Sequence, residues 1–156
     1  IGSVPEAYLM LVGKPNLRGE QYYLDLTKGI QSRCRLIRLY VPMAEIGKYF
    51  AAADAAVHPY LDIDSSGALM LALSFGKPII ATRVGSFPET VEDGGNGYLV
   101  APADSKDLAA AIIRMLRQSP DALRAMGERS LQIALTKHRW ADSARLTLEA
   151  YRRVLV

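Results

Sequence analysis

Residues 64–82, DSSGALMLALSFGKPIIAT, place a polar turn, an apolar helix and a short strand directly one after another. The turn Ser65-Ser66-Gly67 opens the helix, Gly76 and Pro78 end it, and residues 79–81 form the strand. A helix entered in this way directs free backbone N–H groups and the positive end of its dipole into the space before it. The stretch therefore predicts an anion site, of the kind that holds phosphate, at the start of the helix.

The rest of the chain alternates short apolar segments with helical patterns. We predict strands at residues 8–12, 35–40, 55–58, 79–81 and 98–100. Helices are predicted at 20–32, 44–53, 120–136 and 140–154, and another runs from an Asp104 N-cap to residue 116. The second of these has core spacing at Ile46, Tyr49 and Phe50, and the last has an apolar stripe of Leu146, Leu148, Tyr151 and Leu155. This alternation is typical of an α/β, Rossmann-like parallel sheet flanked by helices.

In such sheets ligands bind outside the carboxyl ends of the strands. The loops after Val12, Tyr40, His58 and Thr82 are expected at that edge. A second tight turn, residues 84–89 (VGSFPE), follows Thr82 and carries Glu89 at its tip. Both turns are thus predicted to share one functional edge.

Composition narrows the class of protein. The chain has 156 residues, 50% of them hydrophobic and 22% charged, which fits one globular domain. A single cysteine, Cys34, excludes an internal disulfide and favours a cytoplasmic setting. The net charge of +3 arises late in the chain, where basic and acidic residues alternate on predicted helices. We interpret these as solvated helix faces, with weak attraction to an anionic membrane surface as the alternative, and we find no pattern for nucleic acid.

Several short motifs occur in order and with regular spacing. They are LMLVG (9–13), LYVP (39–42), PY (59–60), SG (66–67), GKPIIAT (76–82), PE (88–89) and GYLVAP (97–102). Together they resemble the C-terminal, nucleotide-sugar-binding domain of a retaining GT-B glycosyltransferase of the family-4 type. The resemblance covers nearly the whole chain. It implies a UDP- or GDP-sugar donor, transfer of the glycosyl group with retention of configuration, and no cofactor or metal.

The resemblance also implies a set of site residues. The base would lie near Leu39 and the turn Tyr40, Val41 and Pro42, and the diphosphate and sugar would lie against the loop and helix start. The candidate catalytic residues are Asp64, which we expect to contact sugar hydroxyls with Asp62 as the alternative, and Glu89 in the second turn. The candidate substrate-binding residues are Gly13, Lys14, Tyr40, Val41, Pro42, Tyr60, Ser65, Ser66, Gly67, Ala68, Leu69 and Leu71.

Two departures from the family are visible. Ile63 and Leu71 stand where many members carry a pair of glutamates, although members with a Ser-Gly loop can lack the pair. The strand and helix that normally open the domain, and the N-terminal acceptor domain, are not found upstream of Ile1. Residues 1–156 are therefore expected to be a single donor-binding domain that lacks its first strand and helix. An acceptor domain or a partner chain would complete it, and the full enzyme would lie in the cytoplasm, with contact to the inner face of a membrane as a further possibility.

Other readings of the same residues remain open. A non-catalytic nucleotide-sugar-binding or regulatory module is the alternative function. Ser65 and Ser66 could serve as helix N-caps, and Glu89 could cap its own short helix. His58 could be structural, and Tyr40 and Tyr60 could pack the loops.

Overall fold

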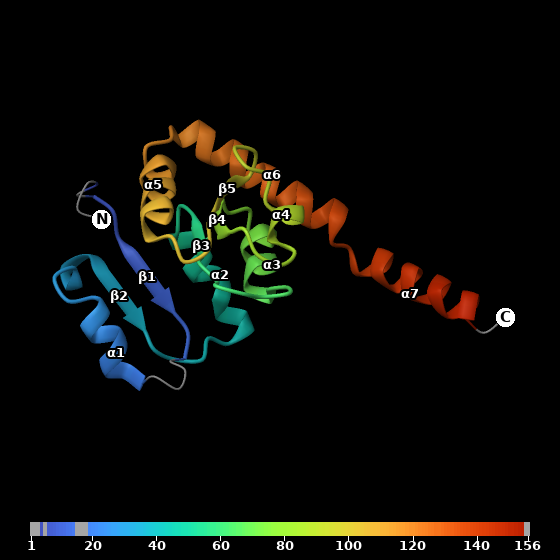
Figure 1. Cartoon of the computed structure of the whole chain (residues 1–156), viewed down its shortest axis with the longest axis horizontal. Helices are drawn as coiled ribbons and strands as arrows, with labels where there is room; N and C mark the ends of the chain where they lie inside the picture. The colour runs from blue at the N-terminus through green and yellow to red at the C-terminus, as the bar shows by residue number, and fades with distance from the viewer. Residues whose placement is uncertain (1–3, 5, 15–18, 155–156) are drawn as a thin grey trace.

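Strands and helices alternate along the chain in the computed structural model, which describes residues 4, 6–14 and 19–154 (Figure 1). Their order is β1 (Leu9–Val12), α1 (Gly19–Leu26), a 3-10 turn (Gln31–Arg33), β2 (Cys34–Ile37), α2 (Met43–Ala52), β3 (Ala56–His58), α3 (Gly67–Ser74), β4 (Ile79–Thr82), α4 (Phe87–Thr90), β5 (Gly97–Val100), α5 (Ser105–Leu116), α6 (Pro120–Lys137) and α7 (Trp140–Val154). The predicted strands and their order are confirmed. The expected Asp104 N-cap is confirmed too, because its carboxylate accepts the N–H groups of Lys106 and Asp107.

All strand pairs are parallel, as predicted, but they form two sheets. In one sheet β1 pairs with β2, and in the other the order is β3-β4-β5. Within the described residues no strand pairing joins β1 to β3.

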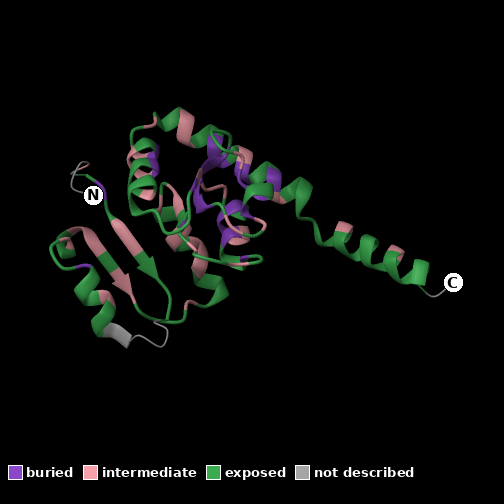
Figure 2. Cartoon of the chain, in the orientation of Figure 1, coloured by how far each residue is buried: buried purple, intermediate pink, exposed green. Residues whose placement is uncertain are grey.

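The hydrophobic core lies around the three-stranded sheet. One cluster packs α3 and α4 against β4 through Leu69, Leu73, Ile79 and Phe87, all with no exposed surface. A second cluster packs α5 and α6 against the other face through Ile80, Tyr98, Met115 and other buried residues. Figure 2 shows the buried residues gathered in this part of the molecule. Parallel strands are stable here because helices cover both faces.

Strands β1 and β2 and helix α2 are far less buried than the three-stranded sheet. Helix α2 has no buried residue, and Leu11 and Val12 of β1 are each 39% exposed. The expected core role of Ile46, Tyr49 and Phe50 on α2 is therefore only partly correct, because these residues are half-buried.

Two element ends differ from the predictions. Helix α1 ends at Leu26 rather than at residue 32, because Thr27 turns its hydroxyl back to the carbonyls of Tyr23 and Leu24 and Gly29 adopts a φ of +87°. Strand β2 ends at Ile37 rather than at Tyr40, since its partner β1 ends at Val12, opposite Ile37. The loop between β2 and α2 therefore begins three residues earlier.

Helix α7 projects away from the body (Figure 1) and has no buried residue. The predicted apolar stripe included Leu146, but on a helix with 3.6 residues per turn Leu146 lies nearly opposite Leu148 and Tyr151. Trp140, Leu148, Tyr151 and Val154 share the apolar face and are 57–90% exposed. Leu155, the last residue of the predicted stripe, lies outside the described residues. In the described part of the chain, no helix is both long and apolar enough to cross a membrane.

Candidate functional site

The start of α3 is built by the loop that follows β3. Ser66 is 6% exposed and is the N-cap of the helix, because its Oγ accepts the N–H of Leu69 at 3.3 Å. The same hydroxyl lies 3.4 Å from the hydroxyl of Tyr60, which ties the loop to the helix start. The capping interpretation of Ser66 is thus confirmed, and Ser65 remains exposed beside it. Gly67 and Ala68 are exposed in the first turn, where an α-helix supplies no acceptor for the backbone N–H groups.

Neither the backbone conformation nor steric crowding requires glycine at position 67. Its φ lies outside the left-handed region, and a Cβ built on it would meet no atom within 4 Å. The space in front of this backbone is therefore open to a ligand. Glycine in such a position permits close approach of a ligand to the backbone.

The second turn lies directly against this loop. The N–H of Ser86 donates to the carbonyl of Asp64 at 3.0 Å. Gly85 has a φ of +49°, and a Cβ there would lie only 1.8 Å from the carbonyl oxygen of Ile63. The two turns predicted from the sequence are thus held together by backbone contacts that only glycine allows.

Two exposed carboxylates lie on these turns. Asp64 precedes Ser65, and Glu89 lies in the first turn of α4 after Ser86. Neither carboxylate takes part in an ion pair with any described residue, so both are free to contact a ligand. Helix α4 has four residues, and the side chain of Ser86 makes no capping hydrogen bond to it. Glu89 is the acidic residue in its first turn.

The aromatic rings of His58, Tyr60 and Phe87, which come from β3 and from the two turns, lie close together. The His58 ring is parallel to that of Tyr60 at 6.3 Å, and Phe87 meets Tyr60 edge-on at 5.6 Å. His58 is 8% exposed and its Nε2 has no hydrogen-bond partner. Burial lowers the pKa of His58 to about 4, so the imidazole is neutral near pH 7. The structural interpretation of His58 fits this position.

A separate hollow lies at the carboxyl ends of β1 and β2. Gly13 and Lys14 line a hollow of about 230 Å³ together with Leu11, Val12, Tyr23, Leu36, Ile37 and Arg38. Sequence reasoning missed Tyr23 and Arg38, which carry no motif. Tyr40 is 80% exposed, Val41 is half-buried and Pro42 is exposed just before α2, so the proposed base-binding turn is accessible.

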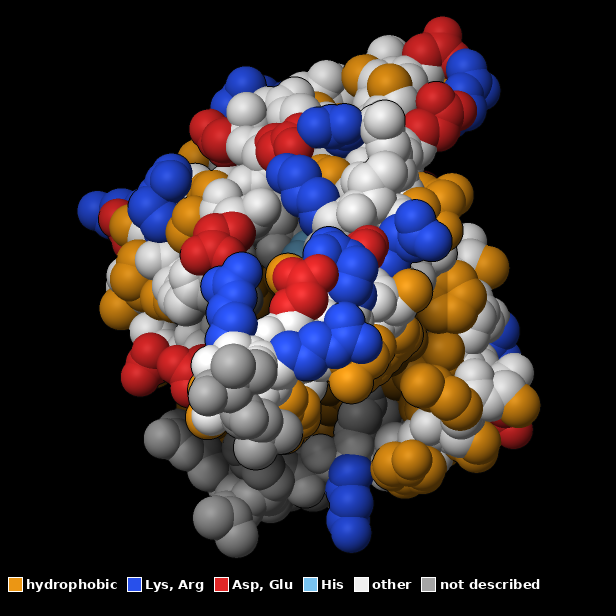
Figure 3. Space-filling view, turned by 90° about the vertical axis from the view of Figure 1, so that its right-hand side faces the viewer, with side chains coloured by type: hydrophobic (Ala, Val, Ile, Leu, Met, Phe, Trp, Pro, Cys, Tyr) orange, Lys and Arg blue, Asp and Glu red, His pale blue; other side chains and the backbone are white. Residues whose placement is uncertain are grey.

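Two of the predicted substrate-binding residues have limited access. The Leu69 side chain is fully buried in the core, and its N–H is already bonded to Ser66, so we do not expect it to contact a ligand directly. Leu71 is half-buried on α3. In the described part of the chain no three His, Cys, Asp or Glu side chains gather where they could hold a metal ion. Figure 3 shows one face on which basic and acidic side chains intermingle rather than forming a continuous basic patch.

Comparison with known proteins connects this arrangement to a family. The sequence profile of the family described as "Glycosyl transferases group 1" matches residues 3–118, well over half of the chain. The chain is 34% identical over 112 residues to MMP alpha-(1->4)-mannosyltransferase from Mycolicibacterium hassiacum, a match that covers 71% of this chain and 27% of that protein. It spans about a quarter of the length of the curated relatives that it matches.

Solved structures show the same architecture. Sucrose-phosphate synthase from Thermosynechococcus elongatus superposes with a TM-score of 0.86 at 24% identity, over 98% of this chain and 40% of that one. Anabaena HepE, in complex with UDP and glucose, superposes with a TM-score of 0.79 at 25% identity, over 96% of this chain and 41% of that one.

Proposed function

Because this chain belongs to the family of group 1 glycosyl transferases, and forms a C-terminal GT-B domain, we propose that it is the donor-binding part of a larger retaining glycosyltransferase. The donor is a UDP- or GDP-sugar. The observation that carries the proposal is the open space at Gly67, in the first turn of α3 and beside the exposed Asp64. HepE, one of the similar proteins, holds UDP in its crystal structure, which supports a uridine donor as the first one to test.

In this proposal the diphosphate lies against the N–H groups of Gly67 and Ala68. These N–H groups are already oriented, so they stabilise an anion without further reorganisation, and the helix dipole adds to the attraction. Lys14, exposed at the end of β1, is proposed to supply a positive charge to the diphosphate. The base lies near Tyr40, Val41 and Pro42, and Tyr60 and Leu71 border the loop and helix that hold the sugar.

The chemistry needs little from the protein beyond charge stabilisation. When the glycosidic bond breaks, negative charge develops on the departing nucleoside diphosphate, and oriented N–H groups lower the energy of that charge. The Asp64 carboxylate orients the sugar by accepting hydrogen bonds from the sugar hydroxyl groups. Glu89, on the second turn, is the other candidate catalytic residue. We expect transfer to proceed with retained configuration and without a metal, so that chelation with EDTA leaves the rate unchanged.

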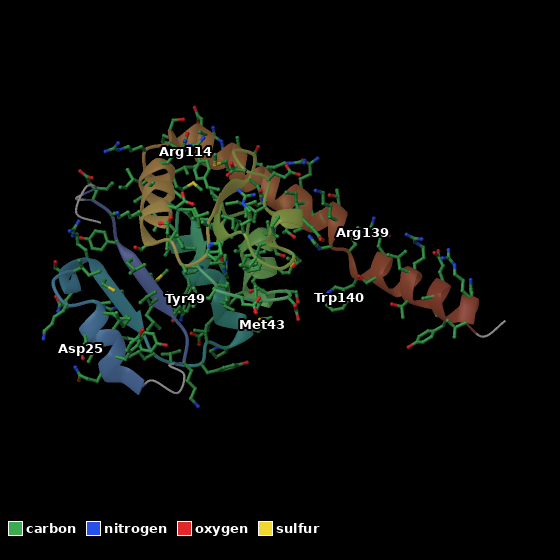
Figure 4. The ribbon with its side chains drawn as sticks, in the orientation of Figure 1. Asp25, Met43, Tyr49, Arg114, Arg139 and Trp140 are labelled. Atoms are coloured by element: carbon green, nitrogen blue, oxygen red, sulfur yellow. The ribbon has the colours of Figure 1, made fainter. Side chains whose placement is uncertain are left out.

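The proposal includes a second domain that binds the acceptor. Helix α7 supports this, since its apolar face is exposed and Figure 4 shows Trp140 at the start of the helix without cover from the body. Trp140 is 90% exposed, and large apolar faces of this kind mark interaction surfaces. We expect the complete enzyme to act in the cytoplasm, with peripheral contact to the inner face of a membrane.

Titration with UDP, GDP and ADP tests donor binding. Calorimetry or NMR of the chain should show weak binding of one of the three, with shifts at Ser66, Gly67 and Ala68. If none of the three nucleotides binds at millimolar concentration, the donor site is not here. Binding without any donor hydrolysis or transfer by the complete protein would favour the regulatory module instead.

Asp64→Asn in the complete enzyme tests the sugar contact. The variant should lower kcat at least tenfold and leave UDP affinity unchanged, because the carboxylate is proposed to meet the sugar and not the nucleotide. Asp62→Asn tests the alternative contact, since Asp62 is also exposed, two residues earlier in the same loop; a loss of kcat in this variant alone would move the contact to Asp62. Normal turnover by Asp64→Asn would exclude this role.

A further inference from the structure

Tyr60, in the loop after β3, contacts three other elements of the fold. Its hydroxyl lies 3.4 Å from the Oγ of Ser66, which caps α3. Its backbone carbonyl accepts a hydrogen bond from the Oγ1 of Thr82, at the end of β4, at 2.6 Å. Its ring meets the ring of Phe87, the first residue of α4, edge-on at 5.6 Å between centroids. Tyr60 therefore connects the start of α3 with the start of α4.

The hydroxyl end of Tyr60 acts on α3 through Ser66. The Oγ of Ser66 accepts the N–H of Leu69 at 3.3 Å, and its own proton is donated to the Tyr60 hydroxyl. Ser66 is only 6% exposed, so water is a poor replacement for this partner, and a buried hydroxyl that loses its partner is costly. Gly67 and Ala68, both exposed, lie within this cap, so the direction of their N–H groups depends on how Ser66 is held.

The ring of Tyr60 acts on α4 through Phe87. Phe87 has no exposed surface, and Glu89 follows it two residues later in the same four-residue helix. A helix of this length gains little from its own hydrogen bonds, so packing decides where it lies. The His58 ring completes the support, because it is parallel to the Tyr60 ring and edge-on to the Phe87 ring at 6.4 Å. The position of the Glu89 carboxylate thus depends on the aromatic contact between Tyr60 and Phe87.

We propose that Tyr60 is a positioning residue, which fixes the N–H groups at the start of α3 relative to the Glu89 carboxylate. It acts through Ser66 at its hydroxyl and through Phe87 at its ring, without touching the reacting atoms itself. Its effect on catalysis rests on the proposed donor site, whereas the link between the two turns rests on contacts within the chain. Groups that stabilise a transition state are effective only when they are held to within a fraction of an ångström.

Tyr60→Phe tests the hydroxyl end, because it removes the hydroxyl and keeps the ring against Phe87. In the complete enzyme the donor KM should rise by about two- to tenfold, the range for one lost hydrogen bond, and kcat should change little. In a Ser66→Ala background Tyr60→Phe should add no further rise in KM, because the residue through which it acts is already gone.

Tyr60→Leu tests the ring end, because it also removes the aromatic contact with Phe87. Here kcat should fall by at least about tenfold, since a small displacement of a reacting group is costly. In a Glu89→Gln background the same substitution should lower kcat little further. Urea unfolding of each variant shows that the protein is folded under the assay conditions, and an unchanged kcat in folded Tyr60→Leu would contradict the link to Glu89.

Amide NMR of the chain without nucleotide tests the link to α3 in the absence of any reaction. Tyr60→Phe should shift the amide signals of Gly67 and Ala68, because the cap that orients them loses one partner. Tyr98→Phe is the matched control, because it removes a hydroxyl that accepts a 2.8 Å hydrogen bond from Gln118 on the other face of the three-stranded sheet. It should leave these amide signals and the donor KM unchanged.

An unchanged donor KM in Tyr60→Phe, in an enzyme that binds its donor, would overturn the inference. A full rise in KM on top of Ser66→Ala would also overturn it, because the hydroxyl would then contact the donor directly. If the unmodified enzyme binds no donor, the proposed function fails, and the spectra without nucleotide decide the link by themselves. Unshifted Gly67 and Ala68 signals in Tyr60→Phe would then refute it.

Discussion

Replacement of Gly67 by alanine separates a ligand contact from a structural role. The added Cβ meets no protein atom within 4 Å, and the φ of Gly67 does not require glycine. Alanine is favoured over glycine in a helix by about 0.5–1 kcal/mol, so the free energy of unfolding should stay the same or rise slightly. A diphosphate that lies against this backbone would instead meet the methyl group. We expect UDP to bind at least tenfold more weakly, a loss of about 1.4 kcal/mol.

Gly85→Ala is the contrasting variant. Its Cβ would lie 1.8 Å from the carbonyl oxygen of Ile63 and 2.7 Å from that of Asp64, at a φ of +49°. The left-handed conformation costs about 1–2 kcal/mol for alanine and the steric overlap about 1–3 kcal/mol more. Urea unfolding should therefore show a large loss of stability for Gly85→Ala and none for Gly67→Ala.

Calorimetric titration of both variants with UDP completes the comparison. The reasoning is refuted if Gly67→Ala binds UDP as tightly as the unmodified chain. It is also refuted if Gly67→Ala loses UDP binding and stability together, because the space at this position would then not be empty.

Three further outcomes follow from the structure. Asn96→Ala should lower the free energy of unfolding by about 2–3 kcal/mol in urea, because the Asn96 amide is fully buried and bonds to the N–H of Glu92 at 2.7 Å and to Ser130 at 3.3 Å. His58 has a folded-state pKa of about 4, below its ordinary value, so the unfolded state takes up the proton first and stability should fall by up to about 3 kcal/mol as the pH drops from 6.5 to 4. His58→Leu should remove that part of the slope in thermal melts, and an unchanged slope would assign it to other groups. Arg129 holds the pKa of Glu92 below its usual range through two 2.7 Å hydrogen bonds, so the stability difference between the unmodified chain and Glu92→Gln should be present at pH 7 and vanish as the pH falls through the lowered pKa.

Local sequence signals were sufficient where the physical cause is itself local. Asp104 caps its helix as predicted, and Ser66 caps α3 as the alternative interpretation proposed, because capping depends on a side chain and the N–H groups two or three residues later. The Pro120 start of α6 follows from the same kind of rule. The family was likewise readable from ordered short motifs.

Predictions failed where the decisive partner is distant in the sequence. The Nζ of Lys77 donates to the carbonyl of Ala53 at 2.9 Å and so anchors the turn before β4, although no neighbouring residue indicates this partner. Strand β2 ends early because β1 does, which no feature of residues 35–40 reveals. The apolar stripe of α7 was misjudged for a different reason, since Leu146 has the right chemistry on the wrong side of the helix.

The sequence by itself determined the alternating α/β order, the helix caps and the polar turn at residues 65–67, since all three depend on periodicity and near neighbours. Only the tertiary structure decided that the turn at Gly85 locks onto the backbone of Ile63 and Asp64, and that the space before Gly67 is empty. It alone also divided the strands into two sheets. These outcomes depend on which backbone atoms meet across long separations in the chain, and side-chain pattern does not encode those distances.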